Sequence, residues 1–284
     1  MADRVLVTLD GVVRDADQPL LCADDLAALR GDGAFETILV RGGRARIVDM
    51  HLARLSKSAE ALDLPAPDLA AWRSVIDTAA EEWGEEAEGA MRVVYSRGRE
   101  GGGDPTGYVL IGPVQDRVRA VRTDGVSVMT MPRGQSVDLG QIAPWQLVGA
   151  KTLSYATNMA ALRFAARYGA DDVIFVSSEG RVLEGPRSTV VIARDKSLIT
   201  PPASQGVLAG TTQRALFQVA EDKGYSCEYA PLFPADLITA DGVWLLSSVT
   251  LAARVHTIDG LELPEPENSG AIPSLVDLAV ESVT

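Results

Sequence analysis

Residues 151–190 constrain the fold of this chain more than any other stretch. The first part of the stretch repeats apolar residues at helical spacing, and three short apolar runs follow at 172–176, 181–185 and 188–193. A helical pattern that changes into several strand patterns predicts a mixed α/β core. The stretch opens with Lys151, which therefore leads the predicted helix.

Lys151 has an unusual setting among the four lysines of the chain. Lys57 falls on the polar face of a predicted helix, Lys196 lies in a polar turn, and Lys223 is next to a helix-ending glycine. Lys151 instead stands between small and apolar residues, where desolvation favours the uncharged amine. An uncharged lysine can act as an amine nucleophile and as a proton carrier.

The composition excludes several classes of partner. The chain has 284 residues, enough for one large or two medium domains. Its 26 Lys and Arg against 39 Asp and Glu give a net charge of −13, which argues against nucleic acids and anionic membranes as partners. The sequence also lacks an apolar run of about 18 residues, so we predict no membrane partner. A negatively charged small substrate would need local arginines.

Histidines and cysteines are too few for several kinds of active site. His51 and His256 alone exclude a histidine-rich metal site and make a Ser-His-Asp site improbable, so we predict no metal. Cys22 and Cys227 lack metal-type spacing and are expected to be free thiols in a reducing cytoplasm. If the chain is an enzyme, its chemistry is expected to come from an organic cofactor.

The N-terminal part holds three segments that each allow two interpretations. Residues 31–40 place two glycines before an alternating strand, which indicates either a plain turn or a tight functional backbone. Arg54 lies beside the apolar stripe of a helix, where most arginines are merely solvated. The glycine-rich loop with Arg97 and Arg99 is either a flexible hairpin tip or a clamp for an anion.

The C-terminal part contributes a carboxylate and a cluster of hydroxyls. Glu184 interrupts an apolar strand, so it should pair either with Arg187 or with a cationic ligand atom. Thr211 and Thr212 stand at the start of a predicted helix, where they can cap the helix and also bind a phosphate. The apolar strand in 243–250 ends in further hydroxyls, which could form a second wall for that anion.

These groups together match the needs of pyridoxal 5′-phosphate. The aldehyde of this cofactor requires a lysine, its pyridine nitrogen an acid, and its phosphate amides, hydroxyls and a cation. The glycine-rich motifs that bind nucleotides are absent from the sequence. We therefore expect a pyridoxal-phosphate enzyme.

The chain also resembles the class IV, or fold-type-IV, pyridoxal-phosphate enzymes from about residue 4 to residue 262. The motifs that carry the resemblance are GDGAFET (31–37), HLARL (51–55), the lysine-led helix at 151, VLEGPRST (182–189), GVLAGTT (206–212) and LLSSVT (245–250). The resemblance implies that Lys151 is the Schiff-base lysine and that Glu184 holds the pyridine nitrogen. It further implies a cofactor shell of Arg54, Tyr155, Thr211, Thr212, Ser247 and Ser248.

Within this group, the loop SRGREGGGDPTGY (96–108) is most similar to that of aminodeoxychorismate lyases. The resemblance thus implies conversion of 4-amino-4-deoxychorismate to 4-aminobenzoate and pyruvate, a folate-pathway step. Arg97 and Arg99 are the candidates to bind the substrate carboxylates. The alternative is an aminotransferase for D-amino acids or branched-chain amino acids, with both activities possible in one protein. A non-catalytic cofactor-binding protein is a further alternative.

The expected architecture follows from the same resemblance. It consists of a small N-terminal α/β domain (1–114) and a larger C-terminal domain (115–284) that carries Lys151, with the cofactor at their interface. The hydrophobic pattern gives way to a run of charges near residues 115–125, which we interpret as the domain junction. The family also implies a cytoplasmic homodimer that acts on a small amine or carboxylate substrate.

Overall fold

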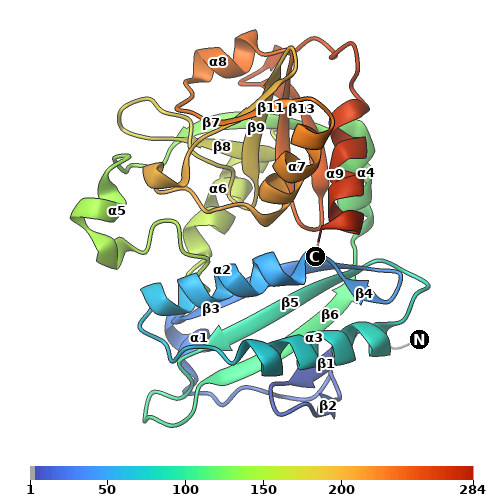
Figure 1. The fold of residues 1–284 in the computed structure, drawn as a ribbon. Coiled ribbons are helices and arrows are strands. Elements are labelled where there is room, and N and C mark those ends of the chain that lie inside the picture. Colours follow the sequence, from blue (N-terminus) through green and yellow to red (C-terminus); the bar gives the residue numbers. More distant parts are fainter. Residues whose placement is uncertain (1–3, 284) are drawn as a thin grey trace. The chain divides into compact units, whose positions relative to one another are not determined.

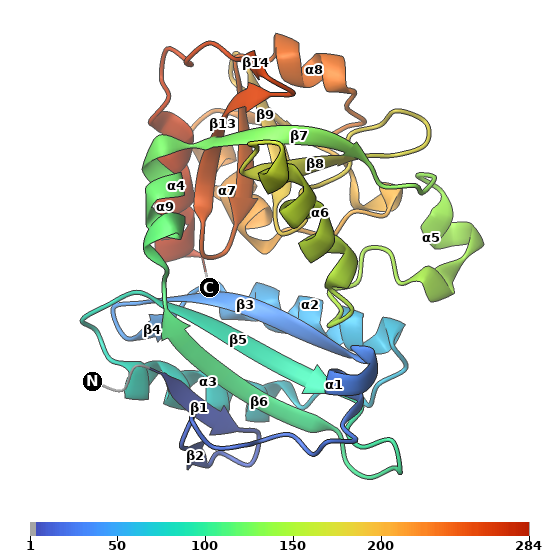
Figure 2. The ribbon, with the colours of Figure 1, turned by 180° about the vertical axis from the view of Figure 1, so that it is seen from behind.

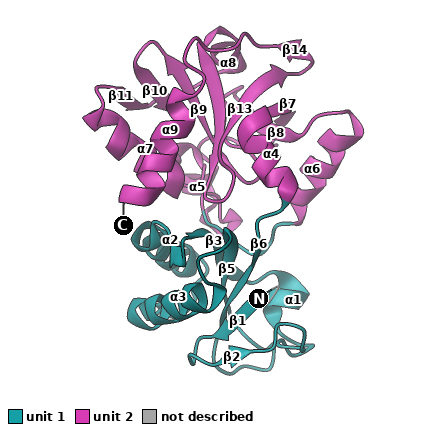
Figure 3. Cartoon of the chain, turned by 90° about the vertical axis from the view of Figure 1, so that its right-hand side faces the viewer, with its two compact units in different colours: residues 1–115, 150–155, 284 teal, residues 116–149, 156–283 magenta. Residues whose placement is uncertain are grey.

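The computed structural model describes residues 4–283, and their contacts form two compact units (Figure 3). The N-terminal unit comprises residues 4–115 and 150–155, and the C-terminal unit comprises residues 116–149 and 156–283. The short segment with Lys151 therefore belongs, by its contacts, to the N-terminal unit. The domain division at residues 114 and 115 stays a prediction.

The N-terminal unit is an antiparallel sheet with helices packed on it. Its elements in chain order are β1 (Val5–Thr8), β2 (Val13–Arg14), α1 (Leu26–Arg30), β3 (Gly33–Arg41), β4 (Arg44–Ala45), α2 (Val48–Ala61), α3 (Leu69–Trp83), β5 (Gly89–Ser96) and β6 (Thr106–Pro113). Within residues 4–115 the strand order is β2-β1-β6-β5-β3-β4, with antiparallel pairing throughout.

Helices α2 and α3 lie against one face of this sheet (Figures 1 and 2). Alternate residues of β3, from Ala34 through Ile38 to Val40, are fully buried, as the period of two in a strand requires. Leu55 of α2 and Trp72 of α3 are also fully buried. The alternation has one exception, because Glu36 occupies a position of this apolar row and is itself buried.

The C-terminal unit is built on a mixed sheet. Its elements are α4 (Asp116–Asp124), β7 (Val126–Pro132), α5 (Leu139–Ile142), η1 (Pro144–Gln146), α6 (Ala156–Arg167), β8 (Asp172–Val176), β9 (Thr189–Arg194), β10 (Ser197–Thr200), η2 (Ala203–Gln205), α7 (Thr211–Asp222), β11 (Ser226–Tyr229), α8 (Pro234–Thr239), β12 (Gly242–Ser247), β13 (Leu251–Ile258), β14 (Leu261–Glu262) and α9 (Ala271–Ser282).

The strands of this sheet follow the order β11-β10-β9-β12-β13-β7-β8 in the described residues, and β14 pairs with β13. The pairs β10–β11, β13–β7 and β7–β8 are parallel, and the others are antiparallel. β9 and β12 are almost continuously apolar and buried, as strands covered on both faces should be. Helix α7 packs against α9 and β12, and α6 packs on β8.

The predicted mixed α/β class is confirmed, but two local expectations are wrong. Residues 181–185 form no strand, since Val182 makes a single bridge to Val176. The charged run forms helix α4, and its interpretation as the domain junction stays a prediction. The helix expected from Lys151 onward begins only at Ala156, because the residues before it pair with β3.

The search for membrane-spanning helices covered the described residues. None of their helices combines the length and the hydrophobicity that crossing a membrane requires.

Candidate active site

The edge of β3 positions the backbone of Lys151. The Phe35 N–H donates to the Lys151 carbonyl at 3.1 Å, and the Leu153 N–H donates to the Gly33 carbonyl at 2.8 Å. The Lys151 N–H donates to Ser58 Oγ of helix α2 at 3.0 Å. Residues 151–153 therefore form an isolated antiparallel bridge to β3, and the position of the lysine is fixed by backbone hydrogen bonds.

Two aromatic rings surround the Lys151 side chain within the N-terminal unit. Its Nζ lies 4.3 Å from the ring centroid of Phe35 and 5.8 Å from that of Tyr155. The two rings meet edge to face, with their centroids 5.4 Å apart. The faces of aromatic rings attract an ammonium, so these rings hold the lysine head group in a defined place. The sequence predicted small and apolar neighbours, and it missed Phe35.

Arg54 belongs to a buried triad with Glu36 and His51. Arg54 Nε donates to Glu36 Oε1 at 2.7 Å, and Arg54 Nη2 donates to Glu36 Oε2 at 2.6 Å. His51 Nδ1 lies 2.7 Å from the same Oε2. The exposed fractions of Glu36, His51 and Arg54 are 1%, 1% and 9%. The expectation of a solvated Arg54 is therefore wrong.

The surroundings of the triad lower the pKa of both of its titratable members, Glu36 and His51. Burial alone would raise the pKa of Glu36, but the charge and hydrogen bonds of Arg54, with help from His51, lower it to about 2. Burial lowers the pKa of His51, against the opposing effect of Glu36, and the positive charges of Arg54 and Lys151 lower it further. At neutral pH the triad is thus an ion pair braced by a neutral imidazole that donates through Nδ1.

Both arginines of the 96–108 loop form ion pairs in the N-terminal unit. Arg97 donates from Nε and Nη2 to Asp32, at 2.7 and 3.3 Å, and from Nη2 to the Leu62 carbonyl at 2.6 Å. Arg99 donates from Nε to Asp24 at 2.9 Å, and 60% of its side chain is exposed. Arg97 therefore holds loops together, whereas Arg99 projects into solvent.

Glu184 lies in the C-terminal unit beside the segment that precedes α7. Its Oε2 accepts the N–H of Leu208 at 3.0 Å, and its backbone pairs with Phe175 of β8. Arg187, which the sequence offered as a partner, instead lies 3.9 Å from Asp172. Glu184 is only half-buried, so its carboxylate is held in place by a backbone amide and can also interact with a cation.

The start of helix α7 gathers hydroxyl groups in the C-terminal unit. Thr211 and Thr212 are buried in its first turn, and no side chain caps the helix. Thr211 Oγ1 lies 3.5 Å from Ser248 Oγ, while Ser247 Oγ accepts the N–H of Thr250 at 3.3 Å. Among the described side chains, the buried Thr212 Oγ1 has no hydrogen-bond partner.

This helix start fits a phosphate group. The first N–H groups of a helix have no partner within the helix, and the helix dipole attracts an anion to them. A buried hydroxyl without a partner costs free energy unless a ligand satisfies it. Gly210 permits the close approach of this turn to β9, because a Cβ there would lie 2.3 Å from Thr189 Oγ1.

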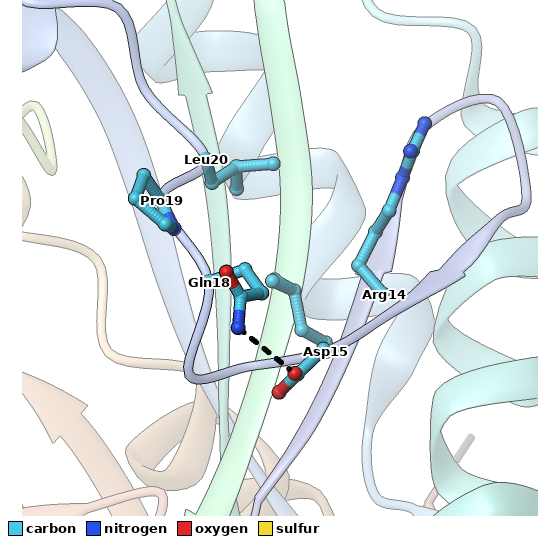
Figure 4. A pocket seen from close by; sticks show the side chains of 6 residues that line it. Arg14, Asp15, Gln18, Pro19 and Leu20 are labelled. Carbon is cyan, nitrogen blue, oxygen red and sulfur yellow. Dashed lines mark hydrogen bonds between the residues drawn. The ribbon is translucent and has the colours of Figure 1, made fainter.

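Other sites are less suited to chemistry. A hollow of about 430 Å³ is lined by Leu6, Arg14, Asp15, Gln18, Pro19 and Leu20 (Figure 4). Its charged side chains are exposed, and Asp15 already accepts bonds from the Gln18 side chain and the Asp17 N–H. No group of three or more possible metal ligands occurs among the described residues.

Comparison with known proteins identifies the family. The model of the family "Amino-transferase class IV" matches residues 33–258. The chain belongs to this family. Its cofactor is pyridoxal 5′-phosphate. The helix start at Thr211, the lysine at 151 and the carboxylate at 184 are the group types that this cofactor needs.

Several relatives cover the full chain. A Mycobacterium tuberculosis protein named bifunctional aminodeoxychorismate lyase / D-amino acid transaminase is 55% identical over 287 residues, covering 98% of this chain and 99% of the relative. A solved structure titled as a hypothetical aminotransferase from M. tuberculosis in the PLP-bound form is 56% identical, covers 99% of this chain and 100% of that chain, and has a TM-score of 0.97. A fold IV transaminase from Curtobacterium pusillum is 39% identical, with 98% of each chain covered and a TM-score of 0.92.

The buried imidazole predicts a pH dependence of stability. The pKa of His51 is lower in the folded state than its usual 6.5, so below pH 6.5 the unfolded chain binds a proton that the folded chain does not. Folding stability should therefore fall on acidification, by at most about 1.4 kcal/mol per pH unit from this group. Glu36 does not contribute to this pH dependence above pH 4.5, because the stability that it provides is lost only as the pH falls from 4.5 toward 2.

We expect His51→Asn to flatten this dependence, because an asparagine amide can replace Nδ1 as donor but does not titrate. Urea unfolding at pH 7 and pH 5 measures the difference between the variant and the wild type. His256→Asn is the control, since its imidazole is only partly buried. Equal slopes in the wild type and His51→Asn would show that the buried imidazole is not responsible.

The tight contact at Gly210 predicts a second effect. A methyl group in Gly210→Ala would lie 2.3 Å from Thr189 Oγ1 and 3.2 Å from Thr189 Cβ. We expect the free energy of unfolding to decrease by about 1–3 kcal/mol and the affinity for pyridoxal phosphate to decrease with it. Thermal unfolding and cofactor titration measure both. Gly270→Ala is the matched control because its Cβ would meet no atom within 4 Å, and equal behaviour of the two variants would contradict the prediction.

Proposed function

We propose that this protein is a pyridoxal-phosphate enzyme that converts 4-amino-4-deoxychorismate to 4-aminobenzoate and pyruvate, and that it also transfers amino groups of D-amino acids. The observation that carries the proposal is the 55% identity, over 98% of the chain, to a relative that bears both names. The lyase activity agrees with the sequence of the 96–108 loop. The transaminase activity agrees with the family match.

When bound, pyridoxal phosphate supplies an electron sink that stabilises negative charge next to the substrate amine. Lys151 binds the cofactor aldehyde, and Glu184 keeps the pyridine nitrogen protonated. Tyr155 lies near the ring, and the residues that hold the phosphate or lie close to it are Arg54, Thr211, Thr212, Ser247 and Ser248.

Lys151 also moves the proton. For the lyase reaction its amine removes the proton from C4 of the substrate. The bond between the ring and the enolpyruvyl oxygen then breaks, so the ring becomes aromatic and enolpyruvate leaves. The proton held by Lys151 returns to the methylene carbon of enolpyruvate, which becomes pyruvate. The reaction needs no oxidant or second substrate. Phe35 and Tyr155 support this role, because they hold the Lys151 head group in one place.

The substrate carboxylates require cations, and Arg99 is the better of the two predicted candidates. Its side chain is mostly exposed, with only the Asp24 contact to exchange. Arg97 would have to leave both Asp32 and the Leu62 carbonyl before it could bind a substrate. Arg97 therefore supports the loop, and Arg99 meets the carboxylate.

The enzyme works as a cytoplasmic homodimer in this proposal. Ile142, the last residue of α5, is 68% exposed, and Trp145 in η1 is 73% exposed. A partner chain would cover such large apolar side chains. The two cysteines, Cys22 and Cys227, are free thiols, which are typical of a reducing compartment.

Two assays separate the proposed activities. Purified enzyme given 4-amino-4-deoxychorismate and no keto acid should release 4-aminobenzoate and pyruvate in equal amounts over many turnovers. Enzyme given D-alanine and α-ketoglutarate should form pyruvate and glutamate. If product formation without a keto acid stops after one turnover, the proposed lyase activity is wrong and the transaminase activity remains.

Lys151→Ala should abolish both activities and the visible absorbance band of the lysine-bound cofactor. Borohydride reduction of the wild type, followed by peptide mass spectrometry, should locate the cofactor on Lys151. Lys57→Ala is the control, because Lys57 is exposed on α2 in the same unit. Retention of the band in Lys151→Ala would falsify the assignment.

A further inference from the structure

Glu36 has no role in the proposed function, yet it is among the most buried charged groups described. Its two oxygens accept both Nε and Nη2 of Arg54, at 2.7 and 2.6 Å. A two-point contact of this kind fixes the plane of a guanidinium as well as its position. His51 Nδ1, 2.7 Å from Oε2, braces the carboxylate from a second direction.

We propose that Glu36 is a positioning residue that sets the orientation of Arg54 before the cofactor phosphate binds. The inference rests on the proposed function, in which Arg54 holds that phosphate. Two of the three guanidinium nitrogens of Arg54 are engaged with Glu36, so its orientation is set by the protein. A ligand group that is already oriented loses less conformational entropy on binding.

The needs of the core do not explain a carboxylate at this position. Glu36 lies in the same row of β3 as Ala34 and Ile38, both fully buried, and faces α2 with them. Removing two charges from water costs more than a well-packed apolar pair would. An apolar pair in place of both Glu36 and Arg54 would therefore serve the fold as well, and what Glu36 adds is its two-point contact with the Arg54 guanidinium.

The negative charge of Glu36 allows a test that separates a positioning effect from a simple charge effect. Glu36 is negative and would repel a phosphate, so a charge effect alone predicts tighter phosphate binding when Glu36 is neutralised. A positioning effect predicts the opposite, because an amide at position 36 would place one of its own donors against an Arg54 donor. The sign of the change in affinity thus distinguishes the two effects.

The test compares two ligands, pyridoxal 5′-phosphate and pyridoxal, which lacks the phosphate. In full-length apoprotein, Glu36→Gln should raise the dissociation constant of pyridoxal phosphate roughly tenfold, as loss of a supporting partner does for other ligand-binding groups, and leave that of pyridoxal unchanged. The matched control is Glu88→Gln, which breaks the partly buried pair with Arg41 at 2.8 Å in the same unit. This control should change neither constant.

A double-mutant cycle separates positioning from a general effect on folding. Arg54→Lys removes the planar fork, so adding Glu36→Gln to it should cost no further affinity for pyridoxal phosphate. If Glu36→Gln does not fold, His51→Leu takes its place, with a few-fold loss for pyridoxal phosphate and none for pyridoxal.

Each remaining outcome has one meaning. An equal loss for both ligands, or unchanged or tighter binding of pyridoxal phosphate by Glu36→Gln, overturns the inference. A wild type that binds neither ligand instead overturns the proposed function, on which the inference rests. If the wild type binds both ligands with equal affinity, Arg54 does not bind the phosphate. This result overturns the inference and does not affect the assignment of Lys151.

Discussion

The backbone hydrogen bonds between residues 151–153 and the edge of β3 are the contacts on which the candidate site depends. They join a segment from a distant part of the sequence to the N-terminal sheet through an isolated bridge. Because backbone pairing fixes both position and direction, the half-buried Lys151 side chain lies against the Phe35 ring. A flexible lysine has large rotamer entropy, and a rigid attachment of its backbone with two aromatic contacts reduces that entropy before any ligand binds.

The N-terminal unit combines this attachment with a costly polar cluster. Glu36, His51 and Arg54 remove two full charges and an imidazole from water on the helix-covered face of the sheet. The cost is offset only because every short contact is charge-assisted and well oriented. The C-terminal unit has a different feature at the start of α7, where the first helix amides have no partner within the helix and lie beside buried hydroxyls. The polar groups of the N-terminal unit are thus charged side chains, whereas those at the start of α7 are backbone dipoles and hydroxyls.

The loop arginines show why a residue type does not define a role. Arg97 and Arg99 are two positions apart in a glycine-rich loop, and the sequence treats them alike. In the structure the Arg97 guanidinium donates hydrogen bonds to Asp32, 65 positions away, and thereby holds two loops together. Arg99 extends outward from the same loop. Their difference comes from partners brought near by folding, which no local pattern contains.

The sequence by itself determined the features that depend on near neighbours. The period of two in β3, the glycine-led start of α7 with its two threonines, and the odd placement of Lys151 are all readable within a few residues. The ordered motifs then indicated the family and its cofactor. Only the tertiary structure decided that Glu36 contacts residues 15 and 18 positions away, that the Lys151 segment pairs with β3 and that Phe35 lies against the Lys151 amine. A glutamate in the apolar row of an alternating strand was a visible signal in the sequence. Its burial and its partners were not, because both are set by how distant segments pack together.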